Sequence, residues 1–126
     1  MMELNPLSNA IIGAAIEVHK ILGPGLLEHV YRDALVYELR LRGFKAESEA
    51  VIPVVYKGVK LELAFRADII VENEIILELK ATDKITPVFK KQLLTYLKLS
   101  GKRLGLLMNF NEVILTKGIT RLVNNF

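Results

Sequence analysis

Cysteine is absent from the sequence, and so is any apolar run long enough to cross a membrane. Without cysteine the chain can form no disulfide, no thiolate zinc site and no cysteine nucleophile. A membrane-spanning helix needs about 20 consecutive apolar residues, and no stretch approaches that length. The N-terminus also lacks the charged-then-apolar pattern of a signal peptide. These absences predict a cytoplasmic protein that works away from the membrane.

The chain does contain enough apolar sequence for one folded domain. Its 126 residues are 52% hydrophobic and 25% charged, a composition typical of globular proteins. That length supports a single domain over residues 1–126 with its own core, but not two domains. The formal net charge of +3 permits binding to nucleic acid without requiring it.

Two apolar, β-branched runs at residues 65–71 and 75–79 predict a β-hairpin. Glu72-Asn73-Glu74 separates them and is typical of a short loop. Side chains alternate faces along a strand, so the pairing depends on the loop length. A loop of three residues would place Asp68 directly opposite Glu78.

Two carboxylates in that position repel each other, because facing Cβ atoms in a sheet are only about 4.5–5.5 Å apart. One solution is a divalent cation with oxygen ligands, with Lys80 adding positive charge nearby. The other is that Asp68 pairs with Arg66 or Lys80 as an ordinary surface charge. The same register puts Arg66 on the face of Asp68 and opposite Lys80. The residues alone leave both interpretations open.

Helical periodicity and stop signals predict the remaining elements. We expect a first helix from residues 5–8 to Gly23, a second over 26–42, strands at Ala46–Tyr56 and from Val59, a third helix over 86–99, and short strands at 104–108 and 113–115, with Leu122 and Val123 docking the tail. The order of helix, helix, three strands, helix, strand, strand predicts an α/β fold, with a mixed β-sheet flanked by helices.

Three side chains on the first two helices admit two interpretations each. His19 lies on an apolar face, where a core histidine bonded to a carbonyl is preferred over an imidazole that faces a site. Glu28 borders the apolar face of the second helix, but with Gly25 as N-cap it would be the third helical residue, where a Glu favours the helix dipole. Glu38 lies within that face and can equally pair with a basic neighbour.

The third helix carries polar groups on two faces. Gln92 and Tyr96 are four residues apart and share a face with Phe89. Lys91 and Lys98 lie on a different face. A solvated face is the preferred interpretation of these lysines, and a strip that contacts phosphates is the alternative.

Six motifs follow one another along the chain. They are G-x-x-E-x-x-Y from Gly25 to Tyr31, Val54-Val55-Tyr56-Lys57-Gly58, Arg66-Ala67-Asp68, Glu78-Leu79-Lys80-Ala81, Gln92-Leu93-Leu94-Thr95-Tyr96-Leu97, and Gly105-Leu106-Leu107-Met108-Asn109-Phe110. Each is weak alone, but the ordered set closely resembles the GxxExxY protein family over nearly the whole chain. That family is a small branch of the PD-(D/E)xK nuclease-like superfamily, so the resemblance implies a restriction-endonuclease-like core.

The resemblance also implies roles for the matching residues. Glu28 matches the helical acid that approaches the superfamily's metal site, and Asp68 matches its metal-binding Asp. Glu78 and Lys80 match the E-x-K pair, in which the Glu binds metal and the Lys positions or activates the attacking water. The backbone carbonyl of Leu79 often completes the metal shell.

Gln92 and Tyr96 match the Q-x-x-x-Y signature of the RecB-like exonuclease branch, where these residues line the site. Two positions depart from the pattern. Ala67 stands where the superfamily has Pro, a common and harmless change. Phe89-Lys90 stands where the family often carries His-Glu, which removes a polar group near Gln92.

The function implied is hydrolysis of phosphodiester bonds in nucleic acid, DNA more than RNA, by a nuclease that uses Mg²⁺ or Mn²⁺. Hard carboxylate oxygens suit Mg²⁺ better than Zn²⁺. The alternative is a catalytically inactive nuclease-like fold that binds nucleic acid or a protein partner. A homodimer is left open.

Overall fold

The structure is a computed structural model that describes residues 3–125, with the backbone alone described at residues 62–64. Its elements are α1 (Leu4–Leu22), α2 (Glu28–Leu41), β1 (Ala46–Tyr56), β2 (Val59–Val71), β3 (Ile75–Lys80), α3 (Pro87–Ser100), β4 (Leu104–Asn109), the 3-10 helix η1 (Leu115–Gly118) and β5 (Ile119–Val123). Within the described chain no helix is long and apolar enough to span a bilayer. The predicted order of helices and strands is confirmed from α1 to β4.

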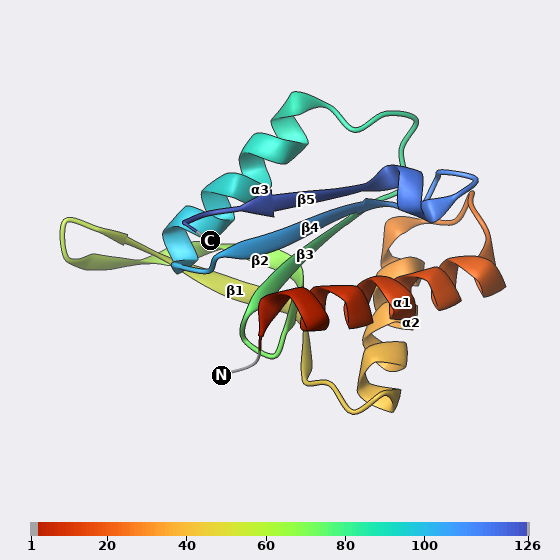
Figure 1. Ribbon diagram of the computed structural model, residues 1–126. Helices are drawn as coiled ribbons and strands as arrows, with labels where there is room; N and C mark the ends of the chain where they lie inside the picture. The colour runs from red at the N-terminus through yellow and green to blue at the C-terminus, as the bar shows by residue number, and fades with distance from the viewer. Residues whose placement is uncertain (1–2, 126) are drawn as a thin grey trace.

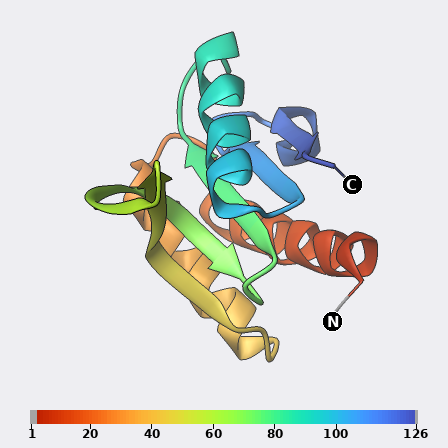
Figure 2. The same cartoon turned by 90° about the vertical axis from the view of Figure 1, so that its left-hand side faces the viewer.

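The five strands form one sheet in the order β1-β2-β3-β4-β5. Neighbouring strands are antiparallel, except that β3 and β4 run parallel. A parallel connection needs a crossover, and α3 supplies it. Figure 1 shows α3 along one side of the sheet, and the turned view in Figure 2 shows α1 and α2 on the other. The fold is thus the predicted α/β arrangement, a mixed sheet between helices.

Each face of the sheet has its own apolar core. The helix-pair core, beneath α1 and α2, includes Ile11, Tyr31, Leu35, Leu39, Ile69, Leu77 and Met108. The α3 core, on the other face, includes Ala50, Ala67, Ile70, Ile76, Leu93, Tyr96 and Leu107. Burial of apolar surface on both faces is what holds the helices against the sheet.

Within a few residues, the buried side chains of the β1–β2 hairpin change from the helix-pair core to the α3 core. Ile69 belongs to the helix-pair core, whereas Ala67 and its partner Ala50 belong to the α3 core. Glu49, just before Ala50, has a left-handed backbone with a φ of 50°, which few non-glycine residues adopt. Asp68 therefore lies at the point where the buried side chains of the hairpin change from one face of the sheet to the other. Toward its tip, the hairpin extends away from the sheet as an arm (Figure 1, yellow-green).

Two element boundaries differ from the predictions. The N-cap of α2 is Leu27 rather than Gly25, so Glu28 is the first helical residue and not the third. The predicted strand at residues 113–115 is wrong, because the chain turns there into η1. Val113 is 83% exposed, and its β propensity is not supported by packing against another strand. The last strand is β5, which contains Leu122 and Val123 and docks the tail as expected.

Candidate functional site

The hairpin of β2 and β3 has the predicted register. Ile69 pairs with Leu77, which requires a loop of three residues centred on Asn73. The ladder of backbone pairs ends at Ile69 and Leu77, away from the loop. Continuing the same register by one residue places Asp68 opposite Glu78. Both side chains lie on the α3 side of the sheet, because each is two residues from a member of the α3 core.

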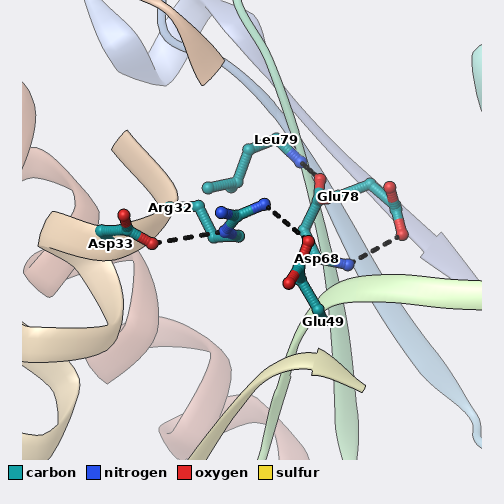
Figure 3. Close-up of polar contacts among 6 residues, drawn as sticks. All are labelled: Arg32, Asp33, Glu49, Asp68, Glu78 and Leu79. Atoms are coloured by element: carbon teal, nitrogen blue, oxygen red, sulfur yellow. Dashed lines mark hydrogen bonds and ion pairs between the residues drawn. The ribbon is translucent and has the colours of Figure 1, made fainter. Parts of the chain in front are cut away.

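Carboxylates replace the backbone ladder at this point. The backbone N–H of Asp68 donates to Glu78 Oε1 at 3.3 Å, and the backbone N–H of Leu79 donates to Asp68 Oδ2 at 2.8 Å. Figure 3 shows this reciprocal arrangement, in which each acid is held by an N–H group of the opposite strand. The sheet therefore orients both carboxylates without a cation.

The pair is electrostatically strained. Burial, and then the charge of Asp68, raise the pKa of Glu78 from its ordinary value of 4.5 to about 8. The nearby positive charge of Lys80 lowers this pKa, but by less. Glu78 is only 6% exposed, so water cannot relieve the repulsion. Without another cation, Glu78 is largely protonated at neutral pH.

The ordinary ion pair considered above is not observed. Among the side chains that the structure describes, neither Arg66 nor Lys80 forms a salt bridge with Asp68. The prediction that Arg66 shares the face of Asp68 is wrong. Arg66 is exposed and follows Phe65, whose ring contacts α3, so Arg66 points to the opposite side of the sheet. The change of sides at Asp68 is the reason. Arg66 also does not pair with Lys80, because the β2–β3 ladder has already ended.

Lys80 is held beside the carboxylates by an aromatic ring. Its Nζ lies 4.5 Å from the centre of the Phe89 ring, within the range of a cation–π interaction. Phe89 stands at the position where the family often has His, and the sequence suggested only a lost polar group. In the structure the replacement orients the lysine instead.

The α3 helix brings Tyr96 to the pair and leaves Gln92 at the surface. Tyr96 is 6% exposed, and its pKa is raised above 10.0 by burial and then by the charges of Glu78 and Asp68. Its hydroxyl therefore keeps its proton at neutral pH and can donate a hydrogen bond. Gln92, one turn earlier, is exposed.

Glu28 does not join this pair. It is exposed at the start of α2, and among the described residues no three Asp, Glu, His or Cys side chains gather closely enough to hold a metal ion. The donor types beside Asp68 and Glu78, two carboxylates and main-chain carbonyls such as that of Leu79, nonetheless suit Mg²⁺ or Mn²⁺. The raised pKa of Glu78 is what a carboxylate pair shows when no cation neutralises it.

A salt bridge ties the start of α2 to β1 near Asp68. Arg32 Nη1 lies 3.3 Å from Glu49 Oε1, and Arg32 Nε lies 3.4 Å from Asp33 Oδ1 (Figure 3). Arg32 follows Glu28 by one helical turn. Partly exposed pairs of this kind stabilise little, but this one links the helix that carries Glu28 to the position facing Asp68.

Two interpretations made from the sequence are confirmed away from the site. His19 is buried, and its Nε2 lies 2.7 Å from the carbonyl oxygen of Glu112, as expected of a core histidine. Glu38 pairs with a basic neighbour, because its Oε2 lies 2.7 Å from Arg42 Nε. Neither side chain takes part in the site.

Asn109 supports the site in a way that the motifs did not reveal. It pairs with Lys80 in the parallel register and is 1% exposed. Its Oδ1 accepts from the backbone N–H of Thr82 at 3.1 Å, and its Nδ2 donates to the Thr82 carbonyl at 2.8 Å. This clamp fixes the chain just after Lys80. A buried amide directly after the apolar run of β4 is the signal that could have identified it.

Known proteins provide an independent comparison. A family model described as the PD-(D/E)XK nuclease superfamily matches residues 5–122. No curated protein sequence matches the chain. A solved structure titled "Crystal structure of SSO0001" is similar, with 26% sequence identity and a TM-score of 0.49, over 75% of this chain and 47% of that one. This chain thus spans less than half the length of that protein. Because the family model covers nearly the whole sequence, the protein belongs to the PD-(D/E)XK nuclease superfamily.

Proposed function

We propose that this chain is a metal-dependent nuclease that hydrolyses phosphodiester bonds in nucleic acid. The pair of Asp68 and Glu78 carries the proposal, because two carboxylates are held together at the end of a ladder although the pKa of Glu78 rises to about 8. A pKa raised strongly by burial and by a specific charged partner is typical of functional sites. Membership of the superfamily supports nuclease activity, and the narrower GxxExxY and RecB-like assignments belong to the proposal.

Asp68 and Glu78 would hold Mg²⁺ or Mn²⁺, with the carbonyl of Leu79 and the side chain of Glu28 as further ligands. Bound metal supplies positive charge that lowers the pKa of water and neutralises phosphate. Glu28 could contribute only if its side chain turned inward from the exposed start of α2.

The other site residues would act on the phosphate and the attacking water. Lys80, held against Phe89, stabilises the charge that develops on the phosphate or orients the water. Tyr96 donates a hydrogen bond from its protonated hydroxyl, and Gln92 offers an amide at the open side of the site. We place DNA ahead of RNA as substrate, on the resemblance to RecB-like exonucleases. A homodimer and a cytoplasmic location stay predictions.

The alternative is a nuclease-like fold without turnover, which binds nucleic acid or a protein partner. The exposed Glu28 favours it, because the described residues supply two clustered carboxylates and not three. Under this alternative Asp68 and Glu78 would be remnants of a catalytic centre.

A divalent-dependent cleavage assay on single- and double-stranded DNA and RNA tests the proposal. We expect wild-type cleavage with Mg²⁺ or Mn²⁺ and none with EDTA. Asp68→Asn, Glu78→Gln and Lys80→Ala should each abolish it, since residues that act as one unit fail together. Glu74→Gln is the matched control, because Glu74 lies at the other end of β3. Activity that survives in Asp68→Asn, or is absent from wild type on all substrates, would contradict the proposal.

A further inference from the structure

We propose that Phe65 is a platform on which an unpaired base stacks beside the reacting phosphate, so that the substrate is single-stranded nucleic acid. The inference rests on the proposed function and specifies its substrate. Phe65 is 39% exposed on β2, and its ring centre lies 4.9 Å from that of Tyr96 with 42° between the planes. Tyr96 is buried and fixed in the α3 core. An exposed ring is thus held in one place by a buried one.

The platform lies next to the carboxylate pair. Tyr96 is close enough to Glu78 and Asp68 for their charges to raise the pKa of its hydroxyl. Phe65 precedes Asp68 by three residues, about 10 Å along an extended strand. Both Phe65 and Asp68 lie on the α3 side, because the hairpin changes sides between them. A nucleotide whose phosphate is at the pair can therefore reach the ring with its base.

Positive charge lies on the same side of the sheet as the ring. Lys80 faces α3, because its Nζ is 4.5 Å from the centre of the Phe89 ring, and its charge acts on Glu78. Arg66, directly after Phe65, points to the opposite face of the sheet and does not contribute. Aromatic rings for stacking with cations for the backbone are the combination that binds single strands without sequence preference. In a duplex the bases are stacked inside and present no free face, so this surface suits unpaired nucleotides.

A second copy of the chain is the competing occupant. The β1–β2 arm exposes further apolar side chains, namely Val51, Val55, Tyr56, Val59 and Leu61. Such a strip could be covered in a dimer. The closeness of the Phe65 ring to the carboxylates, and the presence of Lys80 on the same side of the sheet, favour nucleic acid at Phe65 itself. The oligomeric state is measured in the same experiment.

The test is fluorescence anisotropy of the full chain in EDTA, where cleavage cannot occur, at one fixed salt concentration. The probes are a labelled single-stranded oligonucleotide, the same strand with abasic sites, and a blunt duplex. Phe65→Leu should weaken binding to the intact single strand at least about fivefold, the low end of the effect of losing one stacked base. Binding to the abasic strand and the duplex should change little.

Two variants serve as controls. Phe65→Trp keeps a stacking face and should retain wild-type affinity for the single strand. Tyr37→Leu removes a more exposed ring, 70% accessible, from α2 on the other side of the sheet and should have no effect. Thermal melts establish that each variant is folded, and light scattering gives its mass.

The outcomes separate this inference from the proposed function. Equal losses on intact and abasic strands, no loss with Phe65→Leu, or a loss of dimer mass instead of DNA affinity would overturn the stacking role. If wild type cleaves nucleic acid but Phe65→Leu binds normally, the inference alone fails. If the intact strand binds through Phe65 but no substrate is cleaved, the nuclease proposal alone fails.

Discussion

At the scale of single residues, the protonation of Glu78 makes the stability of the fold depend on pH. Its pKa of about 8 in the folded chain exceeds the ordinary 4.5, so the folded state binds a proton that the unfolded state releases between these pH values. Raising the pH through this window therefore lowers the free energy of unfolding, by up to about 1.4 kcal/mol per pH unit. The metal-free protein should be more stable near pH 5 than near pH 8.

Denaturant melts in EDTA across this pH range measure the effect. Glu78→Gln removes the titrating group and should flatten the dependence, whereas Glu74→Gln should keep it. Equal slopes for wild type and Glu78→Gln would show that the carboxyl is ionised in the folded protein, contrary to this account.

Phe89 is expected to act through Lys80. Phe89→Leu keeps an apolar side chain but removes the ring whose centre lies 4.5 Å from the lysine Nζ. A partly buried cation–π interaction contributes about 0.5–2 kcal/mol, so cleavage should slow by up to about thirtyfold. Phe89→Tyr keeps the ring and should restore the rate.

Cleavage rates measured where each variant is fully folded separate positioning from a merely structural role. Phe89→Leu should cleave more slowly than wild type even at a temperature where thermal melts show it to be fully folded, because the ring no longer holds the lysine. A variant that is slower only because it is less stable would recover the wild-type rate under those conditions. An unchanged rate would remove Phe89 from the site.

At the scale of elements, the distance between α3 and the sheet depends on a glycine. A Cβ added to Gly105 of β4 would lie 2.9 Å from Leu93 Cδ1, closer than Cβ atoms approach other atoms, and 3.1 Å from Leu93 Cγ, which is also a tight contact. Leu93 is fully buried and has no room to move. Gly105→Ala should therefore push α3 outward, destabilise the fold by about 1–3 kcal/mol and displace Tyr96 from the carboxylates.

Thermal melts and cleavage rates check this prediction together. Gly13→Ala is the matched control, because a Cβ there meets its nearest neighbour at 3.6 Å, and alanine should stabilise helix α1 by up to about 1 kcal/mol. If Gly105→Ala melts at the wild-type temperature, the contact between Gly105 and Leu93 does not set the position of α3.

At the scale of the whole molecule, short-range sequence patterns predicted the hairpin of β2 and β3, but not the contacts between segments that are far apart in the chain. The alternation of β2 and β3 and a loop of three residues were enough to place Asp68 opposite Glu78. The face of Arg66 was mispredicted, because β2 changes from one core to the other, which depends on α3. The clamp from Asn109 to Thr82 and the contact between Phe65 and Tyr96 join segments far apart in the chain, so no sequence period reveals them.

Metal binding at Asp68 and Glu78 should stabilise the entire fold, because the cation offsets the repulsion between the two carboxylates. A ligand that binds only the folded state adds about 2.7 kcal/mol at one hundred times its dissociation constant. In slightly smaller domains each kcal/mol raises the melting temperature by roughly 4–8 °C. Saturating Mg²⁺ or Mn²⁺ should thus raise the melting temperature by several degrees.

Thermal melts of wild type and Asp68→Asn, each with EDTA and with millimolar Mn²⁺, test the metal site most directly. We expect the rise in wild type and none in Asp68→Asn. In EDTA above the Glu78 pKa of about 8, where both carboxyl groups of wild type are charged, the variant should be at least as stable as wild type. The asparagine oxygen can still accept the Leu79 N–H bond, while the repulsion between the two charges is gone. An equal rise in both proteins, or a variant clearly less stable in EDTA at that pH, would contradict a metal site built on Asp68 and Glu78.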